Sequence, residues 1–231
     1  MNEKYVKQMS LKEIGEEGQG KIINSSITII GMGGLGCSVF MYLARMGVTN
    51  FKIIDYDIVE TSNLSRQVLY NENSVGKYKV DVASKTIKKI DKAINVKTIK
   101  EKVIEENIEK LLNDCEIIID CTDNLESRRL IANYTVQKNR KLIVGAVEGF
   151  KGWIMNIQSN KTSCYNQIFK NMKDEDINKI GVVGSVVGTI GTIMATETIK
   201  IILGISTPLN SSILFLDEKK MNFRLIPLRG E

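Results

Sequence analysis

Hydrophobic positions in the first 150 residues alternate between short apolar runs and longer stretches with helical spacing. Nearly continuous apolar runs are typical of strands buried on both faces of a parallel sheet. The predicted strands are 27–31, 51–55, 96–100, 116–120 and 141–147, and the predicted helices are 34–46, 76–92, 103–112 and 124–139. This order predicts an α/β fold, a Rossmann-like doubly wound and mainly parallel sheet. The run 96–100 alternates, as an edge strand would.

The pattern changes after residue 150. Residues 153–158, 212–216 and 221–228 alternate apolar and polar positions, which predicts antiparallel strands that extend the sheet. Residues 181–204 form an apolar segment with regularly spaced glycines, and its length is that of a membrane span. Glu197 near its end favours a buried helix packed on the sheet or on a second subunit, and no membrane association is expected.

Composition narrows the class of protein. The 231 residues carry a formal charge of +5 that is spread along the chain, whereas nucleic-acid binders usually cluster their basic residues. The polar, acid-containing N-terminus is unlike a secretory signal, and the four cysteines are scattered. These features favour reduced thiols and a cytoplasmic protein. The chain has no histidine, which excludes histidine-based triads, general bases and metal ligands.

The stretch 29-IIGMGGLGCS-38 places Gly31, Gly33 and Gly36 in the spacing G-x-G-x-x-G after an apolar strand. Gly31 permits the tight turn, Gly33 lets a phosphate approach the backbone, and Gly36 lets the following helix pack closely on the strand. Asp55 ends the next strand, where a carboxylate can accept hydrogen bonds from ribose hydroxyls. A glycine-rich connection without a ligand is the alternative interpretation.

Further polar residues follow strands or begin helices, at the sheet edge where ligands bind in such folds. They are Asp57, Asn63, Arg66, Gln67, Lys79, Thr122, Asp123 and Asn124. Arginine and lysine neutralise phosphate oxygens, and aspartate binds Mg2+. Their combination suggests a triphosphate with its metal. Nothing in the sequence supplies a nicotinamide site or a proton donor, so a NAD-dependent reductase is the weakest interpretation.

The motifs GMGGLG, D-Y-D, SNLSRQ, VGKYK and DCTDN, in this order and spacing, resemble the HesA/MoeB/ThiF family of adenylyltransferases, relatives of ubiquitin-activating enzymes. The resemblance runs from about Tyr5 to about Leu228. It implies one ATP-binding domain over 1–231, with an N-terminal helical arm (1–25), a nucleotide-binding half (26–150) and a C-terminal part (151–231) with a crossover loop.

The resemblance also implies a reaction. Family members use ATP and Mg2+ to adenylate the C-terminal glycine of a small ubiquitin-fold sulfur-carrier protein ending in Gly-Gly, and they work as homodimers. Gly34 and its neighbours would face the nucleotide, and Asp55 the ribose. Asn63, Arg66 and Lys79 would hold phosphates and Asp123 the Mg2+. Such chemistry needs positioning and electrostatics, not a histidine.

Three departures from the family pattern matter. Lys7 stands where the family has an arginine that reaches into the partner subunit's ATP site, and lysine lacks the planar fork. Lys7 is therefore either a catalytic residue acting across the dimer or an ordinary surface lysine. Only Cys164 remains of the cysteine pairs that hold zinc in many members, so we expect no zinc site.

The third departure concerns sulfur chemistry. Relatives that form a covalent intermediate use a cysteine in the loop before the long apolar helix, and 166–180 contains none. Cys164 at the edge of this loop is a candidate thiol, although a lone cysteine is more often structural. We therefore expect the enzyme to stop at the adenylate and a separate sulfur donor to attack it. Two alternatives stay open: adenylation of a ribosomally made peptide, and a non-catalytic carrier-binding protein.

Overall fold

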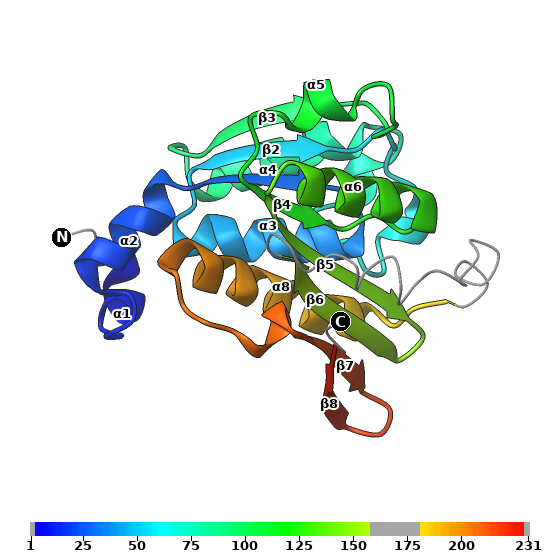
Figure 1. Ribbon diagram of the computed structural model, residues 1–231. Coiled ribbons are helices and arrows are strands. Elements are labelled where there is room, and N and C mark those ends of the chain that lie inside the picture. The colour runs from blue at the N-terminus through cyan, green and yellow to red at the C-terminus, as the bar shows by residue number, and fades with distance from the viewer. Residues whose placement is uncertain (1–2, 158–180, 229–231) are drawn as a thin grey trace.

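The computed structural model describes residues 3–157 and 181–228 and centres on a sheet of eight strands in the order β3-β2-β1-β4-β5-β6-β7-β8 (Figure 1). The first five strands are parallel: β1 (Ser26–Ile30), β2 (Asn50–Ile54), β3 (Asn95–Ile99), β4 (Ile117–Asp120) and β5 (Lys141–Glu148). The other three pair antiparallel: β6 (Lys151–Ile157), β7 (Ser212–Asp217) and β8 (Asn222–Pro227). The predicted sheet is confirmed, including its antiparallel extension and β3 as an edge strand.

Helices cover both faces of the sheet and create two apolar cores (Figure 1). The larger core lies under α3 (Gly34–Met46), α4 (Lys79–Ile90) and α8 (Gly184–Leu203). The smaller lies under α5 (Ile108–Leu112) and α6 (Leu125–Gln137). Burial from both sides explains why β1, β2, β4 and β5 read as continuous apolar runs.

Two helices begin later than their apolar pattern predicts. Gly76 adopts a φ of 81°, so the chain turns there and α4 begins only at Lys79. Asn107 delays α5 because its side chain accepts a hydrogen bond from the Ile104 N–H (2.9 Å) and donates to the Lys102 carbonyl (2.9 Å). These bonds hold the preceding residues in a turn and leave Asn107 as the N-cap.

The apolar helix α8 packs directly against α3. A Cβ atom on Gly191 would lie 2.6 Å from the Ser38 Cβ, so only glycine permits this approach. By length and apolarity α8 meets the criterion for a membrane span, yet 56% of its apolar window is buried inside the protein. Glu197 accepts hydrogen bonds from Asn156 (2.8 Å) and Thr207 (2.6 Å). The prediction of a buried helix packed on the sheet is confirmed.

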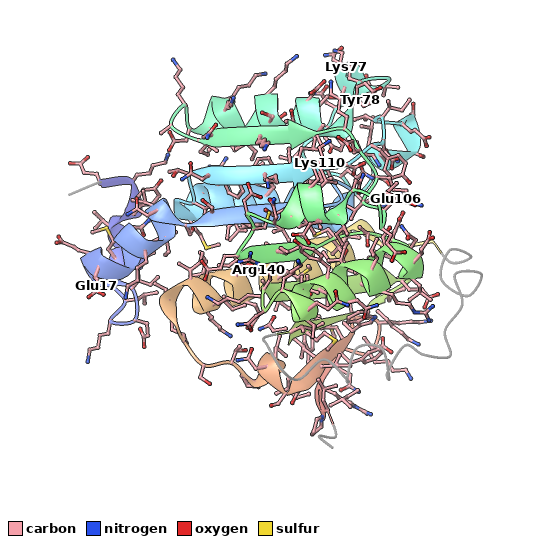
Figure 2. All side chains as sticks on the ribbon, turned by 45° about the horizontal axis from the view of Figure 1, so that its top comes forward. Glu17, Lys77, Tyr78, Glu106, Lys110 and Arg140 are labelled. Atoms are coloured by element: carbon pink, nitrogen blue, oxygen red, sulfur yellow. The ribbon has the colours of Figure 1, made fainter. Side chains whose placement is uncertain are left out.

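An N-terminal arm precedes the sheet, consisting of η1 (Glu3–Tyr5), α1 (Val6–Met9) and α2 (Gly15–Asn24). The arm lies at the end of the sheet where the parallel strands begin (Figure 1). Figure 2 shows Glu17 of the arm at one end of the molecule and Lys77 and Tyr78, which precede α4, at the other. Three single-turn helices complete the described chain: η2 (Thr61–Asn63), η3 (Glu72–Ser74) and η5 (Pro208–Asn210).

Candidate active site

The glycine turn between β1 and α3 is fixed by close backbone contacts. Gly31 has a φ of 91°, and a Cβ there would meet the Cys121 carbonyl oxygen at 2.7 Å. A Cβ on Gly36 would lie 2.0 Å from the Gly31 carbonyl oxygen, and one on Gly34 would lie 2.5 Å from Val187 Cγ1. Gly31 and Gly36 therefore have the turn and packing roles that the sequence predicts.

Gly33 is different, because neither its backbone nor its neighbours require a glycine. Its φ is −76°, and the nearest atom to an added Cβ is the Gln67 side-chain nitrogen at 3.8 Å. Gly33 lines an open cavity, so its missing side chain leaves the backbone accessible to a ligand. The predicted approach of a phosphate to Gly33 is compatible with this geometry and stays a prediction.

Two side chains clamp the peptide groups of Met32 inside the turn. The buried Asp55 accepts hydrogen bonds from the Met32 N–H (2.5 Å) and the Asp57 N–H (2.8 Å). Tyr70 donates its hydroxyl to the Met32 carbonyl (2.7 Å). Burial raises the pKa of Asp55 above its ordinary value of 3.8, while these backbone N–H groups oppose the shift. Each oxygen of Asp55 retains acceptor capacity for a ligand hydroxyl.

A cavity of about 410 Å3 opens at the carboxyl ends of the parallel strands. All but one of the predicted nucleotide contacts line it: Gly31, Gly33, Gly34, Asp55, Asp57, Asn63, Arg66, Gln67, Lys79, Thr122, Asp123 and Asn124. Gly36 does not line it, because it lies beneath the turn and serves helix packing. The described lining carries five acidic residues (Asp55, Asp57, Glu60, Glu101, Asp123) and four basic residues (Arg66, Lys79, Lys102, Arg128).

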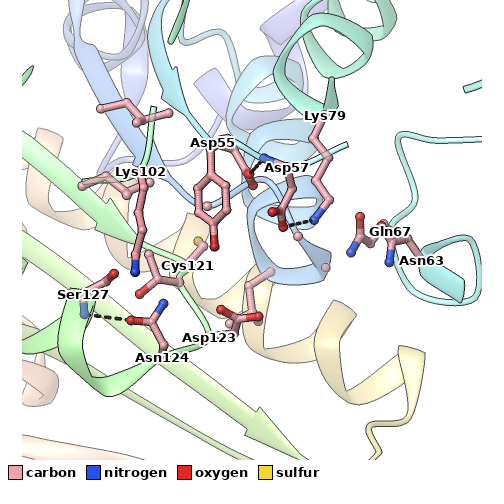
Figure 3. Close-up of a pocket in the computed structure, with 18 of the residues that line it drawn as sticks. Asp55, Asp57, Asn63, Gln67, Lys79, Lys102, Cys121, Asp123, Asn124 and Ser127 are labelled. Carbon is pink, nitrogen blue, oxygen red and sulfur yellow. Dashed lines mark hydrogen bonds and ion pairs between the residues drawn. The ribbon is translucent and has the colours of Figure 1, made fainter. Parts of the chain in front are cut away.

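Lys79 points into the cavity from the start of α4 and pairs with Asp57, as Figure 3 shows. Its Nζ lies 2.7 Å from Asp57 Oδ2, and its side chain is 8% exposed against 46% for Asp57. The Lys79 N–H also donates to the Asp57 carbonyl at 3.0 Å. The ammonium group is therefore held in place, with its charge balanced by a more accessible carboxylate that solvent screens.

The end of η2 and the residues after it bring Asn63, Arg66 and Gln67 to the same wall of the cavity. Asn63 is buried, and its side-chain oxygen accepts a hydrogen bond from the Glu60 N–H (3.2 Å). Arg66 is half-buried and donates to the Ser62 carbonyl at 2.9 Å. Figure 3 shows Asn63 and Gln67 on the same side of the cavity as Lys79.

Within the 120-DCTDN-124 segment, residues 121–124 line the cavity between β4 and α6. Asp120 is fully buried and accepts hydrogen bonds from the Thr122 N–H (2.9 Å) and hydroxyl (2.7 Å). Asn124 caps α6 by accepting from the Ser127 N–H at 2.9 Å. Asp123, held between these two anchors, is exposed. Burial raises the pKa of the Asp120 carboxyl.

Several cavity residues carry no signal in the sequence motifs. Lys102 precedes α5 and points toward Asn124 in Figure 3. Arg128 is buried, donates to the Thr122 carbonyl (3.0 Å from Nε) and stacks 5.8 Å from the centre of the Trp153 ring. Ser127 also lines the cavity, and so does Tyr56, which lies within the D-Y-D motif but is not among the predicted site residues. Their positions follow from the parallel sheet, which places every strand-to-helix connection at one edge.

Lys7 does not line this cavity. It is exposed on α1, in the arm at the opposite end of the sheet (Figure 1). A contact with nucleotide would therefore have to be made in another subunit, as the prediction requires. Cys164 and the loop 166–180 lie outside the described residues. Within 3–157 and 181–228, no group of three or more Cys, Asp or Glu side chains is placed to hold a metal.

The fold and the cavity define a Rossmann-like α/β protein with a glycine turn, a buried aspartate and several charged groups around one ligand site. A model of the ThiF family matches residues 5–231, and the chain belongs to this family. The resemblance seen in the motifs is confirmed.

Two curated relatives and two crystal structures of E. coli MccB are similar to this chain. The chain is 36% identical to adenylyltransferase and sulfurtransferase MOCS3 of Culex quinquefasciatus, over 99% of this chain and 53% of that protein. It is 36% identical to a probable molybdopterin-synthase adenylyltransferase of Gracilaria tenuistipitata var. liui, over 97% of this chain and 65% of the relative. The chain thus spans about half to two thirds of their length.

The crystal structure of E. coli MccB with ATP superposes with a TM-score of 0.85 at 22% identity, covering 99% of this chain and 72% of MccB. MccB was also solved with AMPCPP and MccA, and that structure superposes with a TM-score of 0.86. This likeness shows the fold.

Proposed function

We propose that this protein is an adenylyltransferase that uses ATP and Mg2+ to activate the C-terminal glycine carboxylate of a small ubiquitin-fold sulfur-carrier protein. The products are an acyl-adenylate and pyrophosphate. The observation that carries the proposal is the single cavity in which the glycine turn meets Asp55, Lys79 and Asp123. The names of both curated relatives include adenylyltransferase activity, one of them on molybdopterin synthase.

The two sides of the cavity suit different parts of ATP. Lys79, Asn63 and Gln67 lie on one side and Lys102, Cys121 and Asn124 on the other, with Asp55 between them (Figure 3). We assign the triphosphate to the side with Lys79 and Arg66, and the ribose to Asp55. The base then lies on the side of Lys102, where Val103 and Ile54 supply apolar surface. MccB, with the same fold, was solved with ATP.

The charge balance of the cavity supports a requirement for Mg2+. The described acidic and basic lining residues nearly cancel, so the protein alone does not neutralise a triphosphate. Mg2+ is usually held by one or two carboxylates together with substrate phosphates. The exposed Asp123 fits this role, because its carboxylate faces the cavity from a fixed turn. When bound, the metal supplies positive charge beside the phosphates.

The chain's own residues then bind and orient the reactants. The carrier carboxylate forms a bond to the α-phosphorus of ATP as the bond to pyrophosphate breaks, and no proton has to move. Lys79 and Arg66 stabilise the negative charge that builds on the phosphates, and the clamped glycine turn presents backbone N–H groups. A protein without histidine is equipped for this reaction.

The partners follow from the proposed reaction. A carrier ending in Gly-Gly is the substrate, a separate sulfur donor consumes the adenylate, and a homodimer would let Lys7 act in the partner's site. A peptide substrate is the second candidate, because the structurally similar MccB was solved with MccA. A non-catalytic carrier-binding role is the third, and the joint presence of Asp55, Arg66, Lys79 and Asp123 in one cavity argues against it.

The test is ATP–pyrophosphate exchange with purified protein, Mg2+ and candidate carriers ending in Gly-Gly. We expect carrier-dependent exchange that Asp123→Ala abolishes and Glu106→Ala retains, because Glu106 is exposed and outside the cavity (Figure 2). ATP binding without exchange for any carrier would favour a peptide substrate. A protein that binds no ATP would refute the proposed activity.

A further inference from the structure

Gln67 stands out among the cavity residues because it is buried without being satisfied. Its backbone is fixed: the Gln67 N–H donates to the Asn63 carbonyl (3.0 Å), and its own carbonyl accepts from the Tyr70 N–H (3.1 Å). The residue is 3% exposed, and its side chain lines the cavity beside Gly33. The backbone hydrogen bonds and the burial of the side chain therefore fix the position of Gln67.

The side-chain oxygen of Gln67 is buried and has no hydrogen-bond partner among the described residues. Leaving a buried acceptor unpaired is costly, so such a group calls for an explanation. The neighbouring amide differs, since the Asn63 oxygen accepts from the Glu60 N–H. The Lys79 ammonium donates to Asp57, and no hydrogen bond joins it to the Gln67 oxygen among the described residues. Neither residue supplies the missing donor.

The chemistry of the missing partner is restricted. An amide presents one acceptor and two donors, whichever way its plane is turned. The phosphates of ATP carry only acceptors, so they can use the Gln67 nitrogen but leave its oxygen unpaired. A polypeptide C-terminus offers both kinds of group, because a single carbon atom separates the last N–H from the carboxylate. A primary amide can therefore bind this terminus through two hydrogen bonds.

We propose that Gln67 recognises the end of the substrate polypeptide: its Oε1 accepts the N–H of the terminal residue, and its Nε2 faces the reacting carboxylate. This inference rests on the proposed function and goes beyond it by assigning a substrate-positioning residue. The location agrees, since Gln67 Nε2 lies next to the Gly33 backbone, where the phosphate would approach. Gln67 thereby selects a peptide-linked terminus over one without an N–H.

The experiment removes the N–H of the terminal substrate residue, the amide of Gln67, or both. One probe is a semisynthetic ubiquitin-fold carrier ending in Gly-Gly, and the other carries glycolate in place of the last glycine, so that an ester replaces the N–H. Binding of both is measured by calorimetry with Mg2+ and AMPCPP, whose methylene bridge prevents transfer. We expect wild type to bind the amide probe at least about fivefold more tightly than the ester probe.

In Gln67→Met, which keeps the length of the side chain but lacks the amide, the two probes should bind equally. Gln67→Leu provides a second variant should the first unfold, and Gln137→Leu, exposed on α6, should retain the wild-type ratio. An equal affinity of wild type for both probes, or a ratio that survives in Gln67→Met, overturns the assignment. Binding of AMPCPP but of neither probe overturns the proposed carrier substrate as well.

Discussion

Replacing Lys79 by methionine tests the electrostatic account of the site directly. Methionine keeps an unbranched side chain of similar length and removes only the charged donor. In the structure this donor lies 2.7 Å from Asp57 Oδ2 and is nearly buried. The substitution therefore removes the best-fixed positive charge on the side of the cavity that we assign to the triphosphate.

The structure predicts a small loss in the free energy of unfolding and a larger loss in the affinity for ATP. Because the Asp57 side chain is 46% exposed, solvent screens the ion pair, and losing it should reduce the free energy of unfolding by at most about 1 kcal/mol. A hydrogen bond from an ammonium to a phosphate is stronger, roughly 1.5–3 kcal/mol. ATP should therefore bind about 10- to 150-fold more weakly to the variant.

Calorimetric titration with ATP and with adenosine, together with urea unfolding, measures these quantities. Adenosine has no phosphate, so its affinity should be the same for wild type and Lys79→Met. Lys77→Met is the matched control, because Lys77 is exposed outside the cavity and its ammonium donates to the Asn73 carbonyl, not to a cavity residue. An unchanged ATP affinity in Lys79→Met, or an equal loss for adenosine, would refute the assignment of Lys79 to the phosphates.

Three further outcomes are expected. Gly36→Ala should lower the free energy of unfolding in urea by at least about 1–3 kcal/mol, because its Cβ would lie 2.0 Å from a backbone oxygen. Gly20→Ala in α2 is the control and should not lower it, because no atom lies within 4 Å of the added Cβ. Because burial raises the pKa of Asp120, its contribution to stability declines as pH rises above the ordinary value of 3.8. The free energy of unfolding of Asp120→Asn relative to wild type should therefore increase from about pH 4 to pH 7. A difference that stays constant over this range would contradict a raised pKa of Asp120. If Lys7 acts across a dimer, mixing Lys7→Ala with Asp123→Ala should restore exchange activity above that of either variant alone, and no gain would mark Lys7 as a surface residue.

The fold was predictable because its parallel strands are buried on both faces. Runs such as 27–31 and 116–120 could be assigned from apolarity alone, and each matches a strand to within one residue. The helix ends were less predictable where a side chain or a glycine intervenes. The Asn107 cap shortened the predicted helix 103–112 to its last five residues, which apolar periodicity does not detect.

The candidate site was predictable where a motif fixes residue types along the sheet edge, as at Asp55 and Asp123. Contacts between those residues were not. The pairing of Lys79 with Asp57 depends on two segments meeting in space, and neither motif specifies it. The unpaired oxygen of Gln67 is a property of its surroundings alone. Arg128 escaped notice because an arginine within a helix usually lies on the surface.

The packing of α8 on α3 has a consequence for folding during translation. The strands β2 to β6 are all synthesised between these two helices, so the apolar face of α3 stays without its partner until all of them have been made. At typical rates of about 5–20 residues per second, that interval is on the order of ten seconds. Glu197 finds Asn156 already made, but Thr207 emerges only afterwards. The larger core can therefore close only after α8 has been synthesised, and until then the apolar face of α3 lacks the helix that covers it.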